Sequence, residues 1–149
     1  MDERNYGSFE AGQRLAAKGI VFAPVRGSAI YCESFKSYGF INYGPLTASA
    51  PGAFEVTLDF DPCQFRYLYP HEFIVLPSMA EVWRELLGIL SVNKRWYELR
   101  LIKVDDITQV GYWWLTECLI EFQNRINPAD ALIDLLIWVE QRKEEKSYD

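Results

Sequence analysis

Apolar positions recur with two different periods along this chain of 149 residues. In residues 54–60 every second position is apolar, and this period of two predicts a strand with one buried and one wet face. In residues 127–142 the apolar positions recur every three or four residues, as expected for an amphipathic helix. The chain therefore combines strands and helices.

The predicted C-terminal helix has the clearest end signals. Asn127 is a favourable N-cap, and Pro128 occupies the first helical position, where its missing N–H costs nothing. Asp130 complements the helix dipole. We expect the helix to run from Asn127 to about Arg142, and residues 143–149 to form a frayed, solvated tail. Its predicted core stripe is Leu132, Leu135, Leu136 and Val139.

Ile137 and Trp138 fall on the helical wheel among polar positions such as Asp134. One interpretation is that another element covers them, which would bury the helix on nearly all sides. The other is an exposed Ile137–Trp138 patch that binds a partner protein or a second copy of the chain. These two residues are the candidate partner-binding site.

Two further helices are predicted by their caps. Ser8 can cap a short helix over residues 9–18, which Gly19 would end. Ser78, followed three residues later by Glu81, has the capping-box spacing that opens a second helix. The expected buried face of this second helix comprises Met79, Val82, Trp83, Leu86, Ile89 and Leu90.

The remaining apolar runs predict strands at residues 20–24, 29–35, 54–60, 72–76 and 96–104. Residues 43–53 are rich in Gly, Pro, Ser and Ala and predict an irregular loop. Residues 110–121 have strand-like composition at their start and helical spacing from Leu115 onwards. We favour a hairpin partner for residues 96–104 in this segment, with a helix as the alternative.

These elements predict an α+β fold in a single domain of residues 1–149. A short N-terminal helix, a mostly antiparallel β-sheet and two longer helices packed on it make up the architecture. Half of the residues are apolar and 15% are aromatic, which is enough for a core. The expected core includes Trp83, Leu86, Leu132, Leu135, Leu136 and Val139.

Charge and composition restrict the function. The formal net charge is -6 with no basic stripe, so duplex nucleic acid is an unlikely partner. No run of about 18 apolar residues predicts a membrane span, and no signal-peptide core follows the charged start. Cys32, Cys63 and Cys118 lack C-x-x-C spacing and are interpreted as reduced, buried thiols. We expect a cytoplasmic protein.

Motifs for catalysis or cofactor binding are missing from the sequence. There is no G-x-x-x-x-G-K-[ST] or G-x-G-x-x-G phosphate loop and no G-x-S-x-G elbow. His71, the single histidine, could pair with a cysteine as a nucleophilic dyad or join the three cysteines around zinc. No flanking signature or ligand spacing supports either site. We therefore expect no cofactor and favour a non-enzymatic role.

A small metal-dependent hydrolase or nuclease is the alternative from the enzyme class. Asp59 and Asp61 are two residues apart and could share one strand face as a carboxylate pair for a hard metal ion, with His71 as a further ligand. The simpler interpretation puts Asp59 on the wet face of a strand, and Asp61 with Pro62 in a turn.

One basic and aromatic cluster runs from Lys94 to Lys103. Trp96 could stack on a base while Arg95 and Arg100 contact phosphates, which would give weak single-stranded nucleic-acid binding. Cations interspersed with acidic residues more often form a solvated strand face, and the chain is acidic overall. An acidic mimic of nucleic acid would need one dense carboxylate face, but the acidic residues are dispersed.

Three blocks of the chain resemble a known family, in the same order. They are SFEAGQRLAAKG (residues 8–19), LPSMAEVWRELL (residues 76–87) and NPADALIDLLIWVEQRK (residues 127–143), about a third of the chain. The family consists of small uncharacterised proteins found in prophages and mobile elements of Bacteroidales. The resemblance implies a phage-related accessory setting and carries over no activity, ligand or site residue.

The sequence therefore favours a non-enzymatic protein-interaction module, in the setting of a phage or mobile element. The motivation is the missing catalytic set, the high aromatic content and the Ile137–Trp138 patch. The expected partner is a host or phage protein of unknown identity, with a homo-oligomer as a further option.

Overall fold

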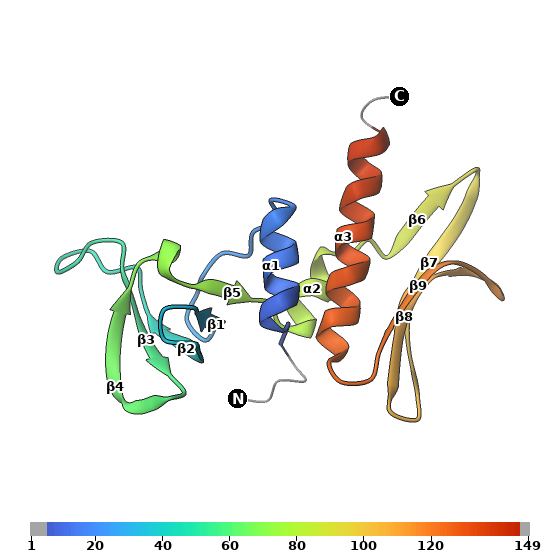
Figure 1. The fold of residues 1–149 in the computed structure, drawn as a ribbon. Helices are drawn as coiled ribbons and strands as arrows, with labels where there is room; N and C mark the ends of the chain where they lie inside the picture. Colours follow the sequence, from blue (N-terminus) through green and yellow to red (C-terminus); the bar gives the residue numbers. More distant parts are fainter. Residues whose placement is uncertain (1–5, 147–149) are drawn as a thin grey trace. The chain divides into compact units, whose positions relative to one another are not determined.

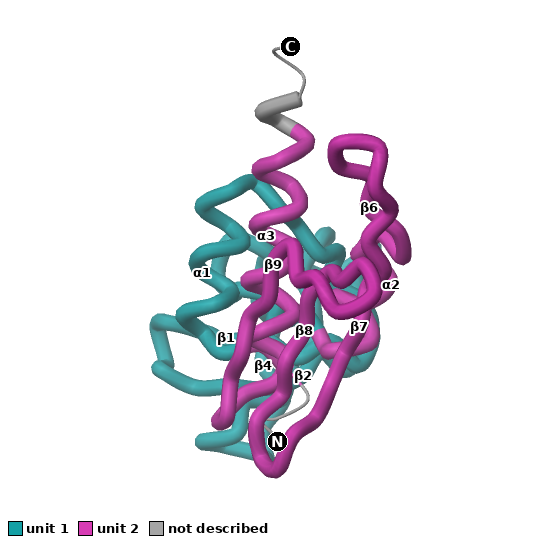
Figure 2. Tube along the Cα trace, turned by 90° about the vertical axis from the view of Figure 1, so that its right-hand side faces the viewer, with its two compact units in different colours: residues 1–3, 8–77 teal, residues 4–7, 78–149 magenta. Residues whose placement is uncertain are grey.

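The computed structural model describes residues 6–146, which form two compact units. The first unit comprises residues 8–77, and the second comprises residues 78–146 together with Tyr6 and Gly7 (Figures 1 and 2). The described residues form three α-helices and nine strands in two antiparallel sheets, so the α+β prediction is confirmed. The prediction of a single domain stays a prediction, because compactness alone does not show whether two units fold independently.

The first unit is a five-stranded antiparallel sheet with one α-helix. Its elements are α1 (Phe9–Ala17), β1 (Ala29–Cys32), β2 (Ser37–Tyr43), β3 (Phe54–Leu58), β4 (Asp61–Leu68), the 3-10 helix η1 (Pro70–Glu72) and β5 (Ile74–Leu76). The strand order is β4-β3-β2-β1-β5. Strands β1 to β4 therefore form a meander, and β5 returns after η1 to pair with β1, which leaves β4 and β5 as the edges.

Two N-terminal caps that the sequence predicts are confirmed. The Ser8 hydroxyl accepts a hydrogen bond from the N–H of Ala11 at the start of α1, and Gly19 follows the helix with a φ of 71°. Ser78 and Glu81 form the reciprocal capping box at the start of the second unit's first helix.

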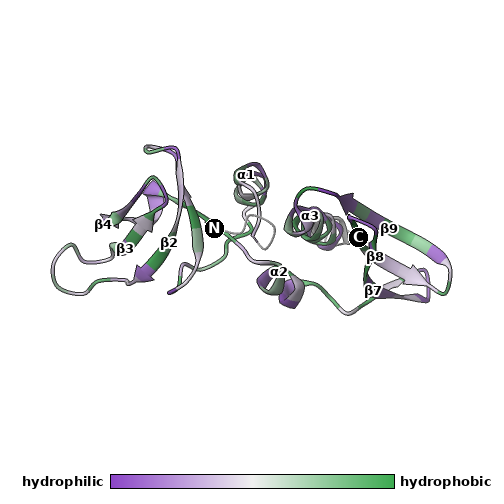
Figure 3. Ribbon diagram, turned by 90° about the horizontal axis from the view of Figure 1, so that it is seen from below, coloured by the Kyte–Doolittle hydropathy of each residue, from purple (hydrophilic) through white to green (hydrophobic). Residues whose placement is uncertain are grey.

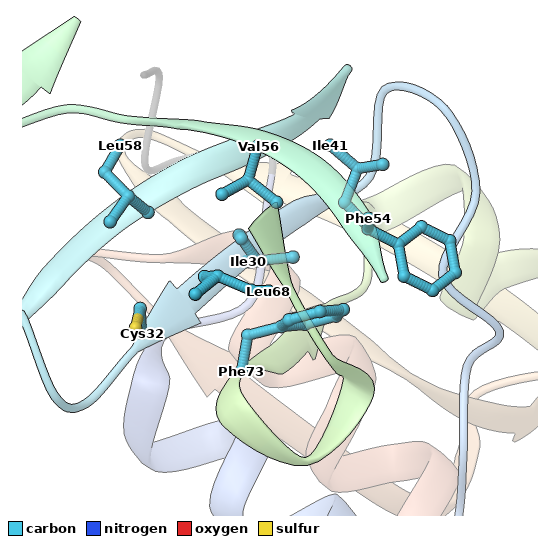
Figure 4. Close-up of a cluster of buried hydrophobic side chains, with 8 residues drawn as sticks. All are labelled: Ile30, Cys32, Ile41, Phe54, Val56, Leu58, Leu68 and Phe73. Atoms are coloured by element: carbon cyan, nitrogen blue, oxygen red, sulfur yellow. The ribbon is translucent and has the colours of Figure 1, made fainter. Parts of the chain in front are cut away.

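The inner face of the first unit's sheet holds a hydrophobic core (Figure 4). It consists of Ile30, Cys32, Ile41, Phe54, Val56, Leu58, Leu68 and Phe73. The strand predicted at residues 54–60 is confirmed, although it ends at Leu58. Because successive side chains of a strand point to opposite faces, Glu55 and Thr57 lie on the outer face.

One strand prediction in the first unit is wrong, and another is confirmed over a shorter range. Residues 20–24 form no strand, and the strand predicted at residues 29–35 ends at Cys32. Residues 33–36 form a tight turn into β2, in which Lys36 has a φ of 50°. A turn of this kind needs no glycine or proline, so the composition of the segment gives no signal for it.

The position of the next turn also differs from the prediction. Asp61 and Pro62, expected in a turn, are the first residues of β4, and the turn lies at Asp59 and Phe60. Proline is compatible with the first positions of an edge strand because no neighbour requires its missing N–H. The turn predicted from Asp61 and Pro62 therefore lies two residues earlier in the chain.

The second unit is a four-stranded antiparallel meander with two helices. Its elements are α2 (Met79–Glu85), β6 (Ile89–Val92), β7 (Arg95–Val104), β8 (Ile107–Trp114), β9 (Glu117–Asn124) and α3 (Pro128–Lys146). Residues 110–121 form a hairpin with β7 as neighbour, so that interpretation is confirmed and the helix alternative is wrong. Helix α3 contacts β8, β9 and α2.

Strands in both units carry hydrophobic residues beside hydrophilic ones (Figure 3).

Helix α3 begins where the sequence predicts and ends later. The side chain of Asn127 accepts a hydrogen bond from the N–H of Ala129 at 3.0 Å. Lys143 pairs with Glu140 at 2.9 Å, and the helix continues to Lys146, so residues 143–146 are not a frayed tail. Residues 147–149 of that predicted tail lie outside the described residues. The buried side comprises Ala129, Ala131, Leu132, Ile133, Leu135, Leu136 and Val139.

Helix α2 is shorter than predicted. Its seven residues make about two turns, and the chain becomes extended at Leu86, with φ -79° and ψ 140°. Leu86 is buried as predicted, whereas Trp83 is 39% exposed, so its assignment to the core is wrong. Ile89, expected on the same helical face, belongs to β6. No helix within residues 6–146 is long and apolar enough to cross a membrane.

Candidate functional site

The outer face of the first unit's sheet has an uncovered aromatic surface near its β4 edge. Tyr43, Phe65 and Tyr67 are 61%, 65% and 56% exposed. Helix α1 packs at the other end of this face, where the Phe9 ring lies 4.1 Å from the Tyr31 ring of β1. The first unit's own helix therefore leaves the outer face of β3 and β4 open.

A row of three side chains crosses β2, β3 and β4 on this face. Glu55 is paired in register with Tyr43 on one side and with Tyr67 on the other. These three residues and residues 46–50 line a cavity of about 410 Å³, which we call the tyrosine pocket. Its volume is in the range of natural ligand pockets, and it is large enough to hold a side chain of a bound peptide.

The loop between β2 and β3 forms the remaining wall of the tyrosine pocket. The N–H of Leu46 donates to the carbonyl oxygen of Ala53 at 2.9 Å, and the N–H of Gly52 donates to that of Leu46 at 2.8 Å. Gly44 has a φ of 143°, and a Cβ at this position would lie 2.6 Å from Cδ1 of Phe54. Only glycine fits there. The loop is thus held against β3 by its own hydrogen bonds and by close packing.

Glu55 gives the tyrosine pocket its charge. The Glu55 side chain is half-buried, and among the side chains that the structure describes, those of residues 6–143, it makes no ion pair and no hydrogen bond. Among the residues that the structure describes, no Lys, Arg or His lines the cavity. A carboxylate between two exposed tyrosine rings, with no cation beside it in this part of the chain, has the chemistry to bind a cationic group.

Strand β4 is an edge strand beside the tyrosine pocket. Residues 65–68 pair regularly with β3, and Asp61 pairs with Leu58, so residues 62–64 are out of register. Such a bulge bends an edge strand and, together with Pro62, blocks the addition of another strand at that end. Residues 65–68 are the regular part of the edge at which an extended segment has room to pair.

The sequence-predicted candidates Ile137 and Trp138 lie on α3, and both are half-buried. The Arg142 guanidinium lies over the Trp138 ring, 5.1 Å from its centroid. The pair is therefore neither an open patch nor a fully covered part of the core. A role of these two residues in binding a partner stays a prediction.

The three candidate metal ligands of the first unit have different surroundings. They are Asp59, Asp61 and His71. The Asp61 carboxylate forms an ion pair with Arg66 at 3.4 Å, and Asp59 is exposed in the turn before β4. His71 is exposed and stacks on Tyr69, with 6.0 Å between the ring centroids. In the part of the chain that the structure describes, no three His, Cys, Asp or Glu side chains are placed to hold a metal ion.

The cysteines differ in exposure. Cys32 is buried as predicted, whereas Cys63 in β4 and Cys118 in β9 are exposed, so the prediction of buried thiols is wrong for these two. Desolvation, with a further contribution from the Glu121 carboxylate, raises the pKa of the Cys118 thiol. The raised pKa lowers the fraction of Cys118 present as thiolate at neutral pH.

Strand alternation separates Arg95 from Trp96 in the basic and aromatic cluster of β7. Trp96 points to one face of the strand, and its neighbour Arg95 points to the other. Arg95 forms an ion pair with Glu117 at 2.6 Å, and Arg100 forms one with Glu98 at 3.3 Å. Arg100 lies on the same face of β7 as Trp96, and both Arg95 and Arg100 have acidic partners within the second unit.

Sequence reasoning did not find the tyrosine pocket. The alternation in residues 54–60 places Glu55 on the wet face, but Tyr67 joins it only when residues 61–68 are known to be a strand. The sequence feature that could have indicated the pocket is the spacing of Phe65 and Tyr67, two aromatic residues on the same face of β4. Tyr43 falls in the segment predicted to be an irregular loop, and its pairing with Glu55 depends on the sheet register.

The fold and the site together define a small α+β protein with an anionic, aromatic cavity beside an open sheet edge. Comparison of the chain with protein-family models, curated proteins and solved structures finds no match. The resemblance to phage-related proteins therefore stays a prediction, and the function has to be argued from the site itself.

Proposed function

We propose that the protein is a non-enzymatic interaction module that binds an extended segment of a partner protein along β4. The observation that carries the proposal is the position of the regular edge, residues 65–68, beside the tyrosine pocket and the exposed ring of Phe65. Main-chain hydrogen bonds to a sheet edge supply affinity in this mode of binding. Pockets for alternate side chains supply specificity.

The charge of the site selects a basic segment. The described residues that line the tyrosine pocket give Glu55 no cationic neighbour, and the whole chain has a formal net charge of -6. Electrostatic complementarity favours encounter with a positively charged partner and disfavours a second copy of this acidic chain. A segment with one or more basic residues is therefore the proposed occupant.

The setting that we propose is that of a phage or mobile-element accessory protein. It is supported by the three blocks at residues 8–19, 76–87 and 127–143 that resemble such proteins. The partner would then be a host or phage protein that presents an extended basic segment. Sequencing the genes that flank this one tests the setting, since neighbours without any phage or mobile-element relationship contradict it.

Selection from a random linear-peptide display library on the immobilised protein tests the binding mode. Enriched peptides are synthesised, and their affinity is measured by fluorescence anisotropy. Bound peptide should slow the hydrogen–deuterium exchange of amides in residues 65–68. Phe65→Ala and Tyr67→Ala should each weaken binding about tenfold or more, as expected for aromatic residues at the centre of an interface.

Trp96→Ala is the matched control, because Trp96 is 66% exposed on a strand of the second unit. It should leave peptide affinity unchanged. Amide protection confined to other residues contradicts binding along β4. Self-association that protects residues 65–68 in the purified protein also overturns the proposal, because the occupant would then be a second copy.

A further inference from the structure

The row Tyr43–Glu55–Tyr67 places one carboxylate between two aromatic side chains of neighbouring strands. Directly paired residues of antiparallel strands have Cβ atoms about 5 Å apart, so both phenol rings start within reach of a group that binds Glu55. Both rings are more than half exposed and therefore accessible to a ligand. A single ligand can therefore contact one negative charge and two aromatic ring faces in this row.

Elsewhere in the chain, arginine side chains occupy this kind of environment. The Arg95 guanidinium lies 4.8 Å from the Trp114 ring centroid and forms an ion pair with Glu117 at 2.6 Å. A planar guanidinium can stack on a ring and bind a carboxylate through two parallel N–H groups at once.

A second case lies in the first unit. The Arg66 guanidinium lies 4.5 Å from the Phe35 ring centroid and is 3.4 Å from the Asp61 carboxylate. Both cases combine an arginine, an aromatic ring and an acidic side chain. The tyrosine pocket has the ring and the carboxylate and, among its lining residues, no arginine.

We propose that the tyrosine pocket binds an arginine side chain of the partner's extended segment. The guanidinium stacks on a tyrosine ring and forms an ion pair with Glu55. This inference rests on the proposed function, because it names the side chain that the interaction module recognises. Arginine is favoured over lysine because the ammonium group is a compact, strongly hydrated charge that cannot form both contacts through one planar face.

The geometry of strand addition is compatible with this assignment. Strands in a sheet lie about 4.8 Å apart, so a segment added beside β4 lies about 10 Å from β3, with Tyr67 between them. The side chain of the added segment that lies opposite Tyr67 on the outer face would pass over the Tyr67 ring to reach Glu55. Arginine is long enough to extend over an aromatic ring with its apolar stem while its charged end reaches the carboxylate.

Small probes test the inference without an identified partner. Ethylguanidinium chloride represents the arginine side chain, N-ethylurea is its neutral analogue of the same shape, and n-butylammonium chloride represents lysine. Each probe is titrated into isotope-labelled protein, and chemical shifts are followed by NMR. Ethylguanidinium should shift resonances of Tyr43, Glu55 and Tyr67 in a saturable manner. N-ethylurea and n-butylammonium should bind about tenfold more weakly.

Substitution of the carboxylate provides the second measurement. Glu55→Gln should remove the preference for ethylguanidinium over N-ethylurea, because it removes the charge and keeps the shape. Glu33→Gln, an exposed glutamate in the turn between β1 and β2, is the matched control and should keep the preference. Unchanged dispersion of the core resonances shows that each variant is folded.

The outcomes separate this inference from the proposed function. Equal binding of ethylguanidinium and N-ethylurea to the wild-type protein overturns the inference, as does equal binding of n-butylammonium. Peptides that protect residues 65–68 would still support the interaction module in that case. Saturable guanidinium binding at Glu55 without any peptide that protects β4 supports the pocket and contradicts strand addition.

Discussion

The hydroxyl group of Tyr112 donates a hydrogen bond of 2.7 Å to the backbone carbonyl oxygen of Leu87. Tyr112 lies in the middle of β8 and is fully buried, whereas Leu87 lies in the link between α2 and β6. One buried hydroxyl therefore ties this link to the central strands of the second unit. It also satisfies the only polar atom of a fully buried side chain.

Loss of this hydroxyl should destabilise the protein. Tyr112→Phe leaves the Leu87 carbonyl oxygen without its partner and should lower the free energy of unfolding by about 1–2 kcal/mol. Urea denaturation monitored by circular dichroism measures the change. Tyr43→Phe, at a mostly exposed tyrosine, is the control and should stay within about 0.5 kcal/mol of the wild type. Equal stability of the Tyr112→Phe variant and the wild type would show that the bond contributes nothing.

Tyr112 should also make stability depend on pH in the alkaline range. Burial raises the pKa of Tyr112 from 10.0 to about 12, because the phenolate would lose its hydration. Its stabilising contribution is fully present below pH 10 and is lost as the pH rises towards 12, because the unfolded state releases the proton first. The unfolding free energy of the wild type should therefore fall more steeply than that of Tyr112→Phe between pH 10 and 12. Parallel profiles of the two proteins would contradict this prediction.

Gly111 is required by close packing of two strands. A Cβ at this position would overlap the backbone carbonyl oxygen of Ile120 in β9 and lie 2.9 Å from Cα of Glu121. Because backbone atoms cannot move aside cheaply, Gly111→Ala should destabilise the protein by about 3 kcal/mol. Thermal and urea unfolding measure the loss.

Gly88 provides the control for this substitution. A Cβ at Gly88 would meet nothing within 4 Å, so Gly88→Ala should change stability by no more than about 0.5 kcal/mol. If both alanine variants unfold at the same urea concentration, the pairing of β8 with β9 does not have the register described.

Arg66 links the two turns at one end of the first unit's sheet. Its guanidinium lies 4.5 Å from the Phe35 ring centroid and 5.1 Å from that of Phe60. Arg66→Ala should lower the unfolding free energy by about 1–2 kcal/mol. Arg66→Lys should lower it by a smaller amount, because an ammonium group does not stack on a ring as a guanidinium does. Arg125→Ala, at an exposed position before α3, should be nearly neutral. An unaltered midpoint for Arg66→Ala would show that the ring contacts do not stabilise the turns.

Trp138 tests the two interpretations of the α3 surface. The side chain is half-buried and in contact with Arg142, so Trp138→Ala should cost about 2 kcal/mol of stability, less than for a fully buried tryptophan. Peptide affinity along β4 should not change. Full stability combined with the loss of a partner in a binding assay would instead identify Ile137 and Trp138 as a binding patch.

The sequence by itself determined the features that depend on neighbours along the chain. The caps at Ser8, Ser78 and Asn127 could be predicted because each one joins groups only two or three residues apart. The alternation at residues 54–60 and the helical spacing after Asn127 likewise identified a strand and a helix with their buried sides.

Only the tertiary structure decided which distant segments meet. The length of α2, the exposure of Trp83 and the start of β4 at Asp61 depend on pairing and packing between segments far apart in the sequence. The tyrosine pocket is the clearest case, because Tyr43, Glu55 and Tyr67 come together only through the register of three strands. A shift of one residue in that register would turn a side chain to the other face, so no local pattern specifies the site.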